Sequence, residues 1–211
     1  GSASDFALNS GTVECWYKTS GAGTGYRAIV VKSWAYQLYL QDNLLIVWDS
    51  QNQRAFSAGV SLNDNTWHHL AFSFQNGVTN GSAIYVDGVL KNTFTYSIAN
   101  QNYPLMFNAT SAGQNGNGSL DEVRIWSTVR TASEIANNRN VSIAANAAGL
   151  AGYLKLDETT GTIANNSVAG GVNGTLVNGP TWSAVTGGFT GNSISPLITP
   201  NLTLSDVDDT A

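Results

Sequence analysis

The hydrophobic side chains of this chain recur at every second position, and this spacing limits the possible fold more than any other feature. Val13, Cys15 and Tyr17 alternate with their neighbours, and the stretch from His68 to Phe74 repeats the pattern. A period of two places successive side chains on opposite faces of a β-strand, whereas an amphipathic helix needs a period of about 3.6. The alternation therefore predicts strands packed face to face and half buried.

Turn sequences such as Asn76-Gly77 and Asp87-Gly88 separate these strands. The predicted strands, with boundaries good to about 2–4 residues, are 12–18, 26–32, 34–40, 44–50, 54–60, 66–75, 82–87, 89–95, 103–108, 119–126 and 151–157. One short helix is predicted after Thr131, because Thr131 and Glu134 have the spacing of a capping box and Ile135 faces inwards. Many short strands with one helix predict an all-β fold, a jelly-roll β-sandwich of two antiparallel sheets.

The composition excludes several functional classes. Charged residues make up 11% of the 211 residues, with a net charge of -5, against roughly 25% charged residues in an average soluble domain. The 9 Lys and Arg residues are scattered, which argues against nucleic-acid binding through phosphate neutralisation. The longest apolar run, Leu44–Trp48, is far shorter than the ~18 residues of a membrane span, so no membrane insertion is expected.

The single cysteine, Cys15, excludes an intrachain disulfide. Low charge with abundant Asn, Ser, Thr and Gly favours an exported protein, located outside the cell or on a bacterial cell surface. Gly1-Ser2 at the start, and the residues after Trp182, whose strand pattern is weak, indicate a module of a longer chain. We expect a domain over 1–185 and a linker over 186–211 that leads to a following repeat, with a frayed tail as the alternative.

Strand direction predicts where the loops lie, because alternate connections of antiparallel strands share one end of a sandwich. The loops expected at the first rim are 19–25, 41–43, 61–65 and 109–118. The loops expected at the other rim are 51–53, 76–81 and 96–102. Long loops on a rigid sandwich usually carry the binding site, and the longest and most polar loop is 109–118. The site is therefore expected on the first rim.

Three motifs, in order along the chain, resemble a laminin-G-like domain of the concanavalin A-like superfamily. They are Asn65–Ala71, Ala83–Gly88 and Gly118–Trp126. Two later segments, 149–162 and 174–182, resemble a motif that accompanies such domains in bacterial surface proteins, so the resemblance runs from about residue 6 to residue 182. It implies a lectin-like module of a large, repeat-built bacterial adhesin. The fold itself hosts lectins, protein binders and glycosidases, so it does not decide the function.

Catalysis is not expected. Glycosidases need two carboxyl groups about 5–9 Å apart, which on one strand means acidic residues at i and i+2, and no predicted strand contains such a pair. Asp121 and Glu122 are adjacent and face opposite ways, and the Glu-x-Asp-x-x-Glu run of the related glucanases is absent. His68 and His69 are also adjacent, so the two imidazoles cannot share one metal ion.

Two aspartates are candidate calcium ligands. The resemblance implies a structural calcium at Asp121, which directly follows the Gly-rich loop; the alternative is that Asp121 caps this loop by accepting backbone N–H groups. Asp42 lies in the stretch Gln41–Trp48, which is similar to the calcium-binding stretch of pentraxins; the alternative is an ordinary hairpin turn. Unlike the pentraxins, loop 109–118 offers amides and hydroxyls but no carboxylate.

Together these observations predict a non-catalytic, lectin-like carbohydrate-binding module, assisted by calcium. Its partner would be a glycan on a host or neighbouring cell, and the module would be monomeric within its longer chain. Aromatic faces and neutral amides suit uncharged sugars. The expected ligand-binding residues are Asp42, Asn43, Tyr26, Trp34, Tyr36, Asn108, Gln114, Asn115 and Asn117. The alternatives are a protein-binding adhesion module, which a large exposed apolar patch would favour, and an appendage of a glycosidase.

Overall fold

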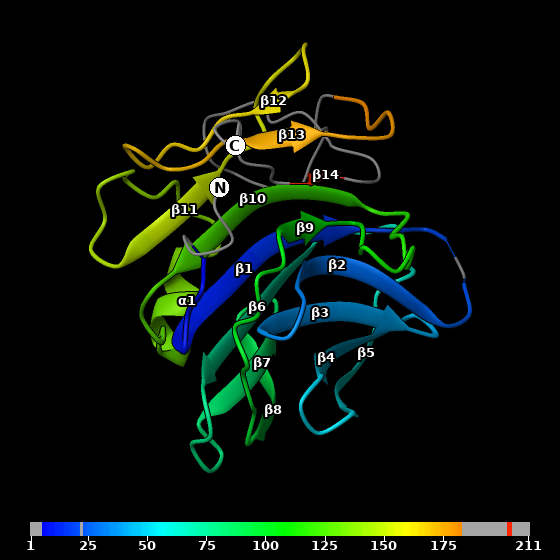
Figure 1. The fold of residues 1–211 in the computed structure, drawn as a ribbon, viewed down its shortest axis with the longest axis vertical. Helices are drawn as coiled ribbons and strands as arrows, with labels where there is room; N and C mark the ends of the chain where they lie inside the picture. Colours follow the sequence, from blue (N-terminus) through cyan, green and yellow to red (C-terminus); the bar gives the residue numbers. More distant parts are fainter. Residues whose placement is uncertain (1–5, 22, 183–201, 204–211) are drawn as a thin grey trace.

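The computed structural model describes residues 6–21, 23–182 and 202–203, and it contains two antiparallel sheets packed face to face (Figure 1). The strands of the six-stranded sheet, in spatial order, are β11 (Leu150–Leu154), β10 (Ser119–Trp126), β1 (Ser10–Lys18), β6 (His68–Gln75), β7 (Ser82–Val86) and β8 (Val89–Phe94). Those of the eight-stranded sheet are β12 (Ile163–Ala164), β13 (Gly174–Leu176), β14 (Leu202–Thr203), β9 (Leu105–Phe107), β2 (Tyr26–Lys32), β3 (Tyr36–Gln41), β4 (Leu44–Asp49) and β5 (Arg54–Ser61).

This architecture confirms the predicted all-β sandwich, and β1 to β11 lie where the alternation predicts strands. Strands β12, β13 and β14 were not predicted, because each has only two or three residues and shows no alternation of hydrophobic side chains. Most of the predicted linker over 186–211 lies outside the described residues. Within it, β14 pairs with β13 and with β9. None of the helices in the described ranges has the length and apolar character needed to cross a membrane.

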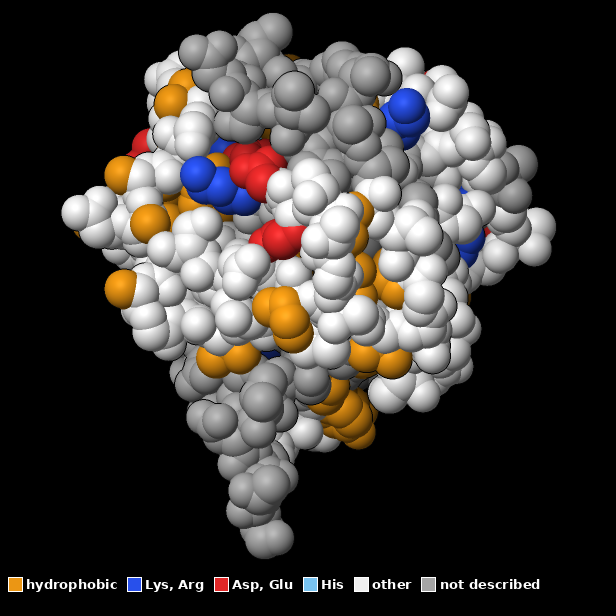
Figure 2. Space-filling view, turned by 90° about the horizontal axis from the view of Figure 1, so that it is seen from above, with side chains coloured by type: hydrophobic (Ala, Val, Ile, Leu, Met, Phe, Trp, Pro, Cys, Tyr) orange, Lys and Arg blue, Asp and Glu red, His pale blue; other side chains and the backbone are white. Residues whose placement is uncertain are grey.

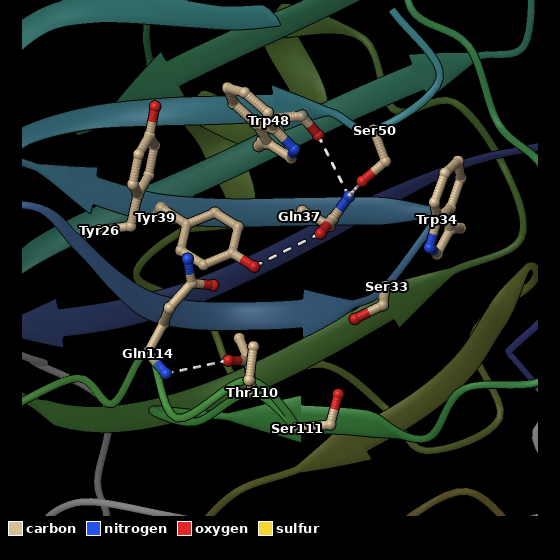
Figure 3. A pocket seen from close by; sticks show the side chains of 11 residues that line it. Tyr26, Ser33, Trp34, Gln37, Tyr39, Trp48, Ser50, Thr110, Ser111 and Gln114 are labelled. Atoms are coloured by element: carbon tan, nitrogen blue, oxygen red, sulfur yellow. Dashed lines mark hydrogen bonds between the residues drawn. The ribbon is translucent and has the colours of Figure 1, made fainter. Parts of the chain in front are cut away.

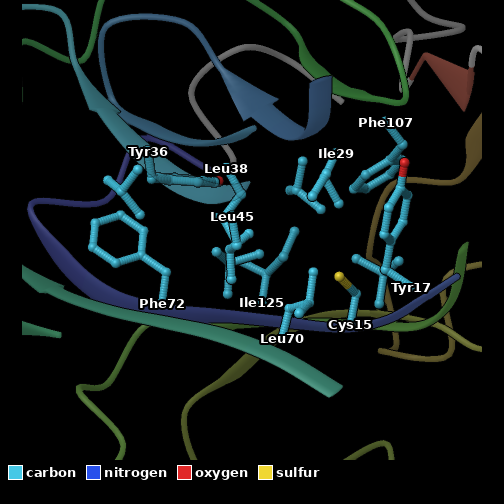
Figure 4. Packing of buried hydrophobic residues seen from close by; sticks show 14 of the residues in the cluster. Cys15, Tyr17, Ile29, Tyr36, Leu38, Leu45, Leu70, Phe72, Phe107 and Ile125 are labelled. Atoms are coloured by element: carbon cyan, nitrogen blue, oxygen red, sulfur yellow. The ribbon is translucent and has the colours of Figure 1, made fainter. Parts of the chain in front are cut away.

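The core lies between the two sheets and is filled by the inward-facing side chains of both (Figure 4). Cys15 and Tyr17 enter from β1, Phe72 enters from β6, and Tyr36 and Leu38 enter from β3. The alternation therefore determines the two faces of β3: its even-numbered residues belong to the core, and its odd-numbered residues lie on the outer face of the eight-stranded sheet.

The predicted helix is present as α1 (Ala132–Asn138) with both halves of its capping box. Thr131 Oγ1 accepts the N–H of Glu134 at 3.2 Å, and Glu134 Oε2 accepts the N–H of Thr131 at 2.8 Å. Ile135 packs with Ala71, Ala83 and Tyr85 on the outer face of the six-stranded sheet. The helix therefore covers the six-stranded sheet, and the outer face described below belongs to the eight-stranded sheet.

A buried polar network lies on the same outer face and explains His69. The Nε2 atom of His69 is 3.2 Å from Glu14 Oε2, and Trp126 Nε1 donates to Glu14 Oε1 at 2.6 Å. Burial alone would raise the pKa of Glu14, but the hydrogen bonds from His69 and Trp126 and the charges of His69 and Arg124 together outweigh burial and lower it. His68 instead contacts Asp64 and Asp87, so the two histidines have separate partners, as their adjacency predicts. His69 is part of the folded scaffold.

Candidate functional site

The four loops assigned to the first rim do meet there. Backbone hydrogen bonds join Asn65 N to Thr19 O at 3.0 Å, Leu62 N to Asn43 O at 3.1 Å, and Asp42 N to Gly25 O at 3.2 Å. Loop 109–118 joins them through Asn117, whose Oδ1 accepts from Thr19 Oγ1 at 3.2 Å. The four loops therefore share one rim, as predicted, because alternate connections of antiparallel strands lie at the same end of the sandwich.

A pocket of about 210 Å³ lies on the outer face of the eight-stranded sheet, between β2, β3, β4 and loop 109–118 (Figure 3). It extends from Tyr26, where β2 starts at the first rim, to Trp34 and Ser50 near the other rim, so it is not confined to the rim where the site was expected. It is smaller than the roughly 300–1,000 Å³ of pockets for drug-sized ligands. Its lining residues are Tyr26, Ser33, Trp34, Gln37, Tyr39, Trp48, Ser50, Thr110, Ser111, Ala112 and Gln114. A pocket of this size has room for one ring-sized group of a ligand.

The floor of the pocket is formed by Gln37 and Tyr39, the outward-facing residues of β3. The amide nitrogen of Gln37 donates to Ser50 Oγ at 2.6 Å and to Trp48 O at 3.4 Å (Figure 3). The hydroxyl of Tyr39 donates to Gln37 Oε1 at 3.4 Å, and burial raises the pKa of this hydroxyl, which keeps it protonated. The polar groups of the floor are therefore neutral and fixed in orientation before a ligand arrives.

Aromatic rings form two walls at opposite ends of the pocket (Figure 3). At one end Tyr26 packs edge-on against Trp48, with ring centroids 5.5 Å apart, and against Tyr39, with centroids 6.1 Å apart. Such T-shaped contacts hold the orientation of the rings. At the other end lies Trp34, in the turn between β2 and β3.

Trp34 has a φ of 64°, in the left-handed region. A bulky side chain is a rare outlier there, and holding it costs about 1–3 kcal/mol. Its carbonyl accepts the N–H of Ala99 at 2.8 Å, and this hydrogen bond helps to hold the turn. The backbone therefore holds the indole at the pocket in a conformation that glycine or asparagine would adopt more easily.

Loop 109–118 forms the polar side of the pocket. Gln114 N donates to Thr110 Oγ1 at 3.1 Å, and Gln114 O accepts the N–H of Ala28 at 3.2 Å. The loop lies so close to β2 that a Cβ at Gly116 would overlap Ala28 O and lie 2.6 Å from Asn108 Oδ1. The wall that carries Thr110 and Gln114 is thus fixed against the sheet.

Arg27 of β2 ties the rim loops together, although its side chain is buried. Its Nη1 donates to Gly21 O at 2.8 Å and to Asn117 Oδ1 at 2.7 Å, and its Nη2 donates to Asn43 Oδ1 at 2.6 Å. One guanidinium therefore links three loops of the rim.

The structure separates the predicted ligand-binding residues into groups. Tyr26, Trp34 and Gln114 line the pocket. Asn43 and Asn117 lie on the rim, where their side-chain oxygens accept hydrogen bonds from Arg27.

The remaining predicted residues do not line the pocket. Asp42 and Asn115 are exposed on the rim, and Asp42 Oδ1 accepts the N–H of Gly25 at 2.8 Å. Two predictions need correction. Tyr36 is buried in the core, where it stacks on Phe74, because it has the same phase as Leu38 in β3. Asn108 is 1% exposed and braces its own loop by donating to Gly118 O at 2.8 Å.

Sequence reasoning missed several lining residues. The lining residues outside the predicted ligand-binding set are Ser33, Gln37, Tyr39, Trp48, Ser50, Thr110, Ser111 and Ala112. The phase of β3 contained the signal for Gln37, because a strand that sends Leu38 and Leu40 into the core must present residues 37 and 39 outside.

The calcium candidates already have hydrogen-bonding roles. Asp121 is 2% exposed, and its Oδ1 accepts the N–H of Glu122, its neighbour in β10, at 3.0 Å; this hydrogen bond lies within the strand and not in the Gly-rich loop. Asp42 lies in a two-residue turn with Asn43, both at positive φ, which is the hairpin alternative. Among the described residues no cluster of three His, Cys, Asp or Glu side chains is placed to hold a metal ion. Calcium at Asp42 or Asp121 stays a prediction that chelation tests.

Comparisons with known proteins concern mainly the fold. A Bacteroides ovatus protein provisionally described as carbohydrate-binding is 21% identical, with a TM-score of 0.66 over 82% of this chain and 55% of that one. The binding domain of Paraclostridial mosquitocidal protein 1 is 11% identical, with a TM-score of 0.50 over 97% of this chain and 57% of that one. The chain thus spans little more than half of either structure. No curated protein matches.

A family model gives the closest assignment. The model described as the concanavalin A-like lectin/glucanases superfamily, of laminin-G type, matches residues 2–136. This stretch contains β1 to β10, and with them the pocket and the whole first rim. The chain therefore belongs to the laminin-G-like family of the concanavalin A-like lectin/glucanase superfamily.

Proposed function

We propose that the chain is a non-catalytic carbohydrate-binding module whose pocket takes one neutral sugar ring. The observation that carries the proposal is the lining of the pocket: indole and phenol rings at both ends, a buried amide on the floor and hydroxyls at the side. Ring faces contact the C–H surfaces of a sugar, and amides and hydroxyls pair with its hydroxyl groups. Membership of a superfamily named for lectins and glucanases supports this use of the fold.

The same lining supports binding without catalysis. None of the described lining residues is Asp, Glu, Lys, Arg or His. Glycoside hydrolysis uses a pair of carboxyl groups, and the pocket walls offer tryptophan, tyrosine, serine, threonine and glutamine in their place. An uncharged lining also favours an uncharged sugar, because an anionic sugar would lose hydration without gaining a cationic partner.

Exposed hydrophobic side chains give the protein-binding alternative less support. The exposed large ones among the described residues are Leu44, Val78, Val89, Leu90, Val141, Ile163 and Val177; Val89 and Leu90 are neighbours in β8, and the other five come from separate strands and loops. On the face seen from above, hydrophobic side chains form small groups separated by backbone and other side chains (Figure 2). Protein-binding surfaces usually need a larger continuous apolar patch.

The wider role that we propose is attachment. The module would act outside the cell, within a longer bacterial surface adhesin, and would hold glycans of a host or neighbouring cell. Binding of the fluorescently labelled chain to intact cells, and its loss after the cells are treated with glycosidases, tests this role.

The pocket itself is tested with a glycan array that contains neutral and sialylated glycans, followed by titration of the best neutral ligand. Trp48→Ala removes one wall, and we expect about a tenfold loss of affinity, equivalent to ~1.4 kcal/mol. Trp182→Ala is the matched control, since Trp182 is also half-buried but does not line the pocket. Absence of any bound glycan, or equal affinity of Trp48→Ala and the unchanged chain, would overturn the proposal.

A further inference from the structure

We propose that the buried guanidinium of Arg27 is the structural cation of the first rim, and that the rim keeps its shape without calcium. The loops meet around one positive group, and that group belongs to the chain itself. Three oxygen atoms, Gly21 O, Asn43 Oδ1 and Asn117 Oδ1, lie 2.6 to 2.8 Å from its two terminal nitrogens. This inference concerns the rim and does not depend on the ligand of the pocket.

The two amide oxygens have no remaining capacity for a metal ion. Each carbonyl-type oxygen accepts through two lone pairs. Asn43 Oδ1 accepts from Arg27 Nη2 at 2.6 Å and from Gly23 N at 3.1 Å. Asn117 Oδ1 accepts from Arg27 Nη1 at 2.7 Å and from Thr19 Oγ1 at 3.2 Å. A calcium ion at this position would have to displace the guanidinium and break these hydrogen bonds.

The charge of the donors also fits a guanidinium better than a calcium ion. The three acceptors are two amide oxygens and one backbone carbonyl, all of them neutral. Calcium affinity increases with the number of carboxylate ligands. Asp42 lies next to Asn43 in the turn, but its Oδ1 accepts the N–H of Gly25 at 2.8 Å. A planar, singly charged fork can satisfy several neutral acceptors at once.

The loop 19–25 is shaped to close on this group. A Cβ at Gly21 would overlap Asn117 Nδ2, and a Cβ at Gly23 would lie 3.0 Å from Arg27 Nε. Glycine at both positions therefore lets the loop backbone approach the guanidinium and its asparagine partner. Gly21 and Gly23 are explained by this close approach as well as by the turn character of glycine.

Arg27 also positions the polar wall of the pocket. It holds Asn117 directly, and the next residue, Ala28, holds Gln114 of the same loop through its backbone N–H. The loop is thus fixed to β2 at two neighbouring points, one on the rim and one in the pocket. Arg27 does not line the pocket, so it is a positioning residue.

The decisive measurement is the melting temperature of the unchanged chain, recorded in excess chelator and again in millimolar calcium, where extracellular modules bind this ion. A ligand that binds only the folded state raises the melting temperature. We expect the same value in both conditions. A melting temperature that falls on chelation and recovers with calcium would overturn the proposal, and this arm needs no variant.

Variants test the role of the guanidinium. Arg27→Lys keeps the charge but has a single terminal nitrogen in place of the planar fork, so it cannot reach acceptors that are divided between Nη1 and Nη2. We expect its melting temperature to fall by at least ~5 °C. Arg54→Lys is the control, because Arg54 is exposed and its contacts, with Asp49 at 3.7 Å, Thr95 O at 3.0 Å and the ring of Phe56, all lie away from the first rim. Its melting temperature should fall less than that of Arg27→Lys. Equal melting of Arg27→Lys and the unchanged chain would contradict the proposal. If Arg27→Lys does not fold while Arg54→Lys does, the loss of stability is specific to Arg27, as the proposal expects.

A third arm uses the neutral glycan found on the array. Arg27→Lys should bind it less tightly because the wall of Gln114 moves, while Arg54→Lys should bind it unchanged. If no glycan binds the unchanged chain, the proposed function fails, but the two melting experiments still decide the role of Arg27.

Discussion

At the scale of single residues, the conformation of Trp34 points to a binding role, because the fold uses only its backbone carbonyl, which any residue would offer to Ala99. Its φ of 64° would suit glycine or asparagine, and its side chain is only half-buried. Strain of this kind persists where the surrounding structure enforces it, and it collects at binding sites. The indole of Trp34 lines the pocket at the end opposite Tyr26.

Trp34→Asn should separate stability from binding. Asparagine adopts the left-handed region more easily than tryptophan, so the free energy of unfolding should not fall and should rise by up to ~1 kcal/mol. Affinity for the neutral glycan should fall about tenfold, because one aromatic wall is lost. Denaturant unfolding and calorimetric titration measure the two quantities. Trp34→Phe, which keeps a ring, is the control, and a Trp34→Asn variant that binds as tightly as the unchanged chain would contradict this role.

His68 adds a dependence on pH to the first rim. Its Nδ1 lies 2.8 Å from Asp87 Oδ2, and its Nε2 lies 3.1 Å from Asp64 Oδ2. The hydrogen bond with Asp87 raises the pKa of His68 above its ordinary 6.5, and Asp64 acts in the same direction against the opposing effect of burial. Because the folded-state pKa is raised, the stabilisation is complete below pH 6.5 and is lost as the pH rises through the folded-state pKa.

We therefore expect the stability of the unchanged chain to decline from pH 6.5 upwards by less than ~1 kcal/mol, the range of solvent-exposed ion pairs. His68→Gln should remove this part of the decline. Denaturant unfolding of both proteins across this pH range measures it. Parallel pH profiles of the two proteins would show that His68 is not its source.

At the scale of elements, the alternation predicted most strands, because each of them has one face in the core. It could also have distinguished Tyr36 from Tyr39, which look alike in the sequence but lie on opposite faces of β3. It could not predict the partners of Arg27. Asn43 and Asn117 are 16 and 90 residues away along the chain, and only the assembled loops bring them together. Local patterns therefore gave the sheets and the rim, but not the contacts across the rim.

Gly116→Ala tests how tightly the loop 109–118 must lie on β2. The added methyl would overlap Ala28 O, which is backbone and cannot turn aside, so the loop must shift. We expect a loss of about 1–3 kcal/mol in the free energy of unfolding, as for other overpacked sites, together with weaker glycan binding. Gly59→Ala is the control: Gly59 has a φ of 68° and open space around it, so it should lose ~1 kcal/mol without any change in affinity. Unchanged binding by Gly116→Ala would show that the wall does not matter for the ligand.

At the scale of the whole molecule, the two sheets are completed by strands outside the stretch that matches the family model. The match ends at residue 136, but β11 pairs with β10, and β13 connects through β14 to β9. The C-terminal residues thus contribute to both layers of the sandwich. The functional loops lie within the matched stretch, but the sheets that support them extend beyond it.

This arrangement has a consequence for association between molecules. A chain that ends before β11 would leave one side of β10 and one side of β9 as edge strands with free N–H and C=O groups. Such edges pair with other chains, so we expect the shortened protein to form concentration-dependent aggregates. Analytical ultracentrifugation of the shortened and full chains measures this, and identical sedimentation of the two would contradict it. In the full chain, the last strands would then protect the sandwich from self-association while the pocket on the outer face of the eight-stranded sheet stays open to a ligand.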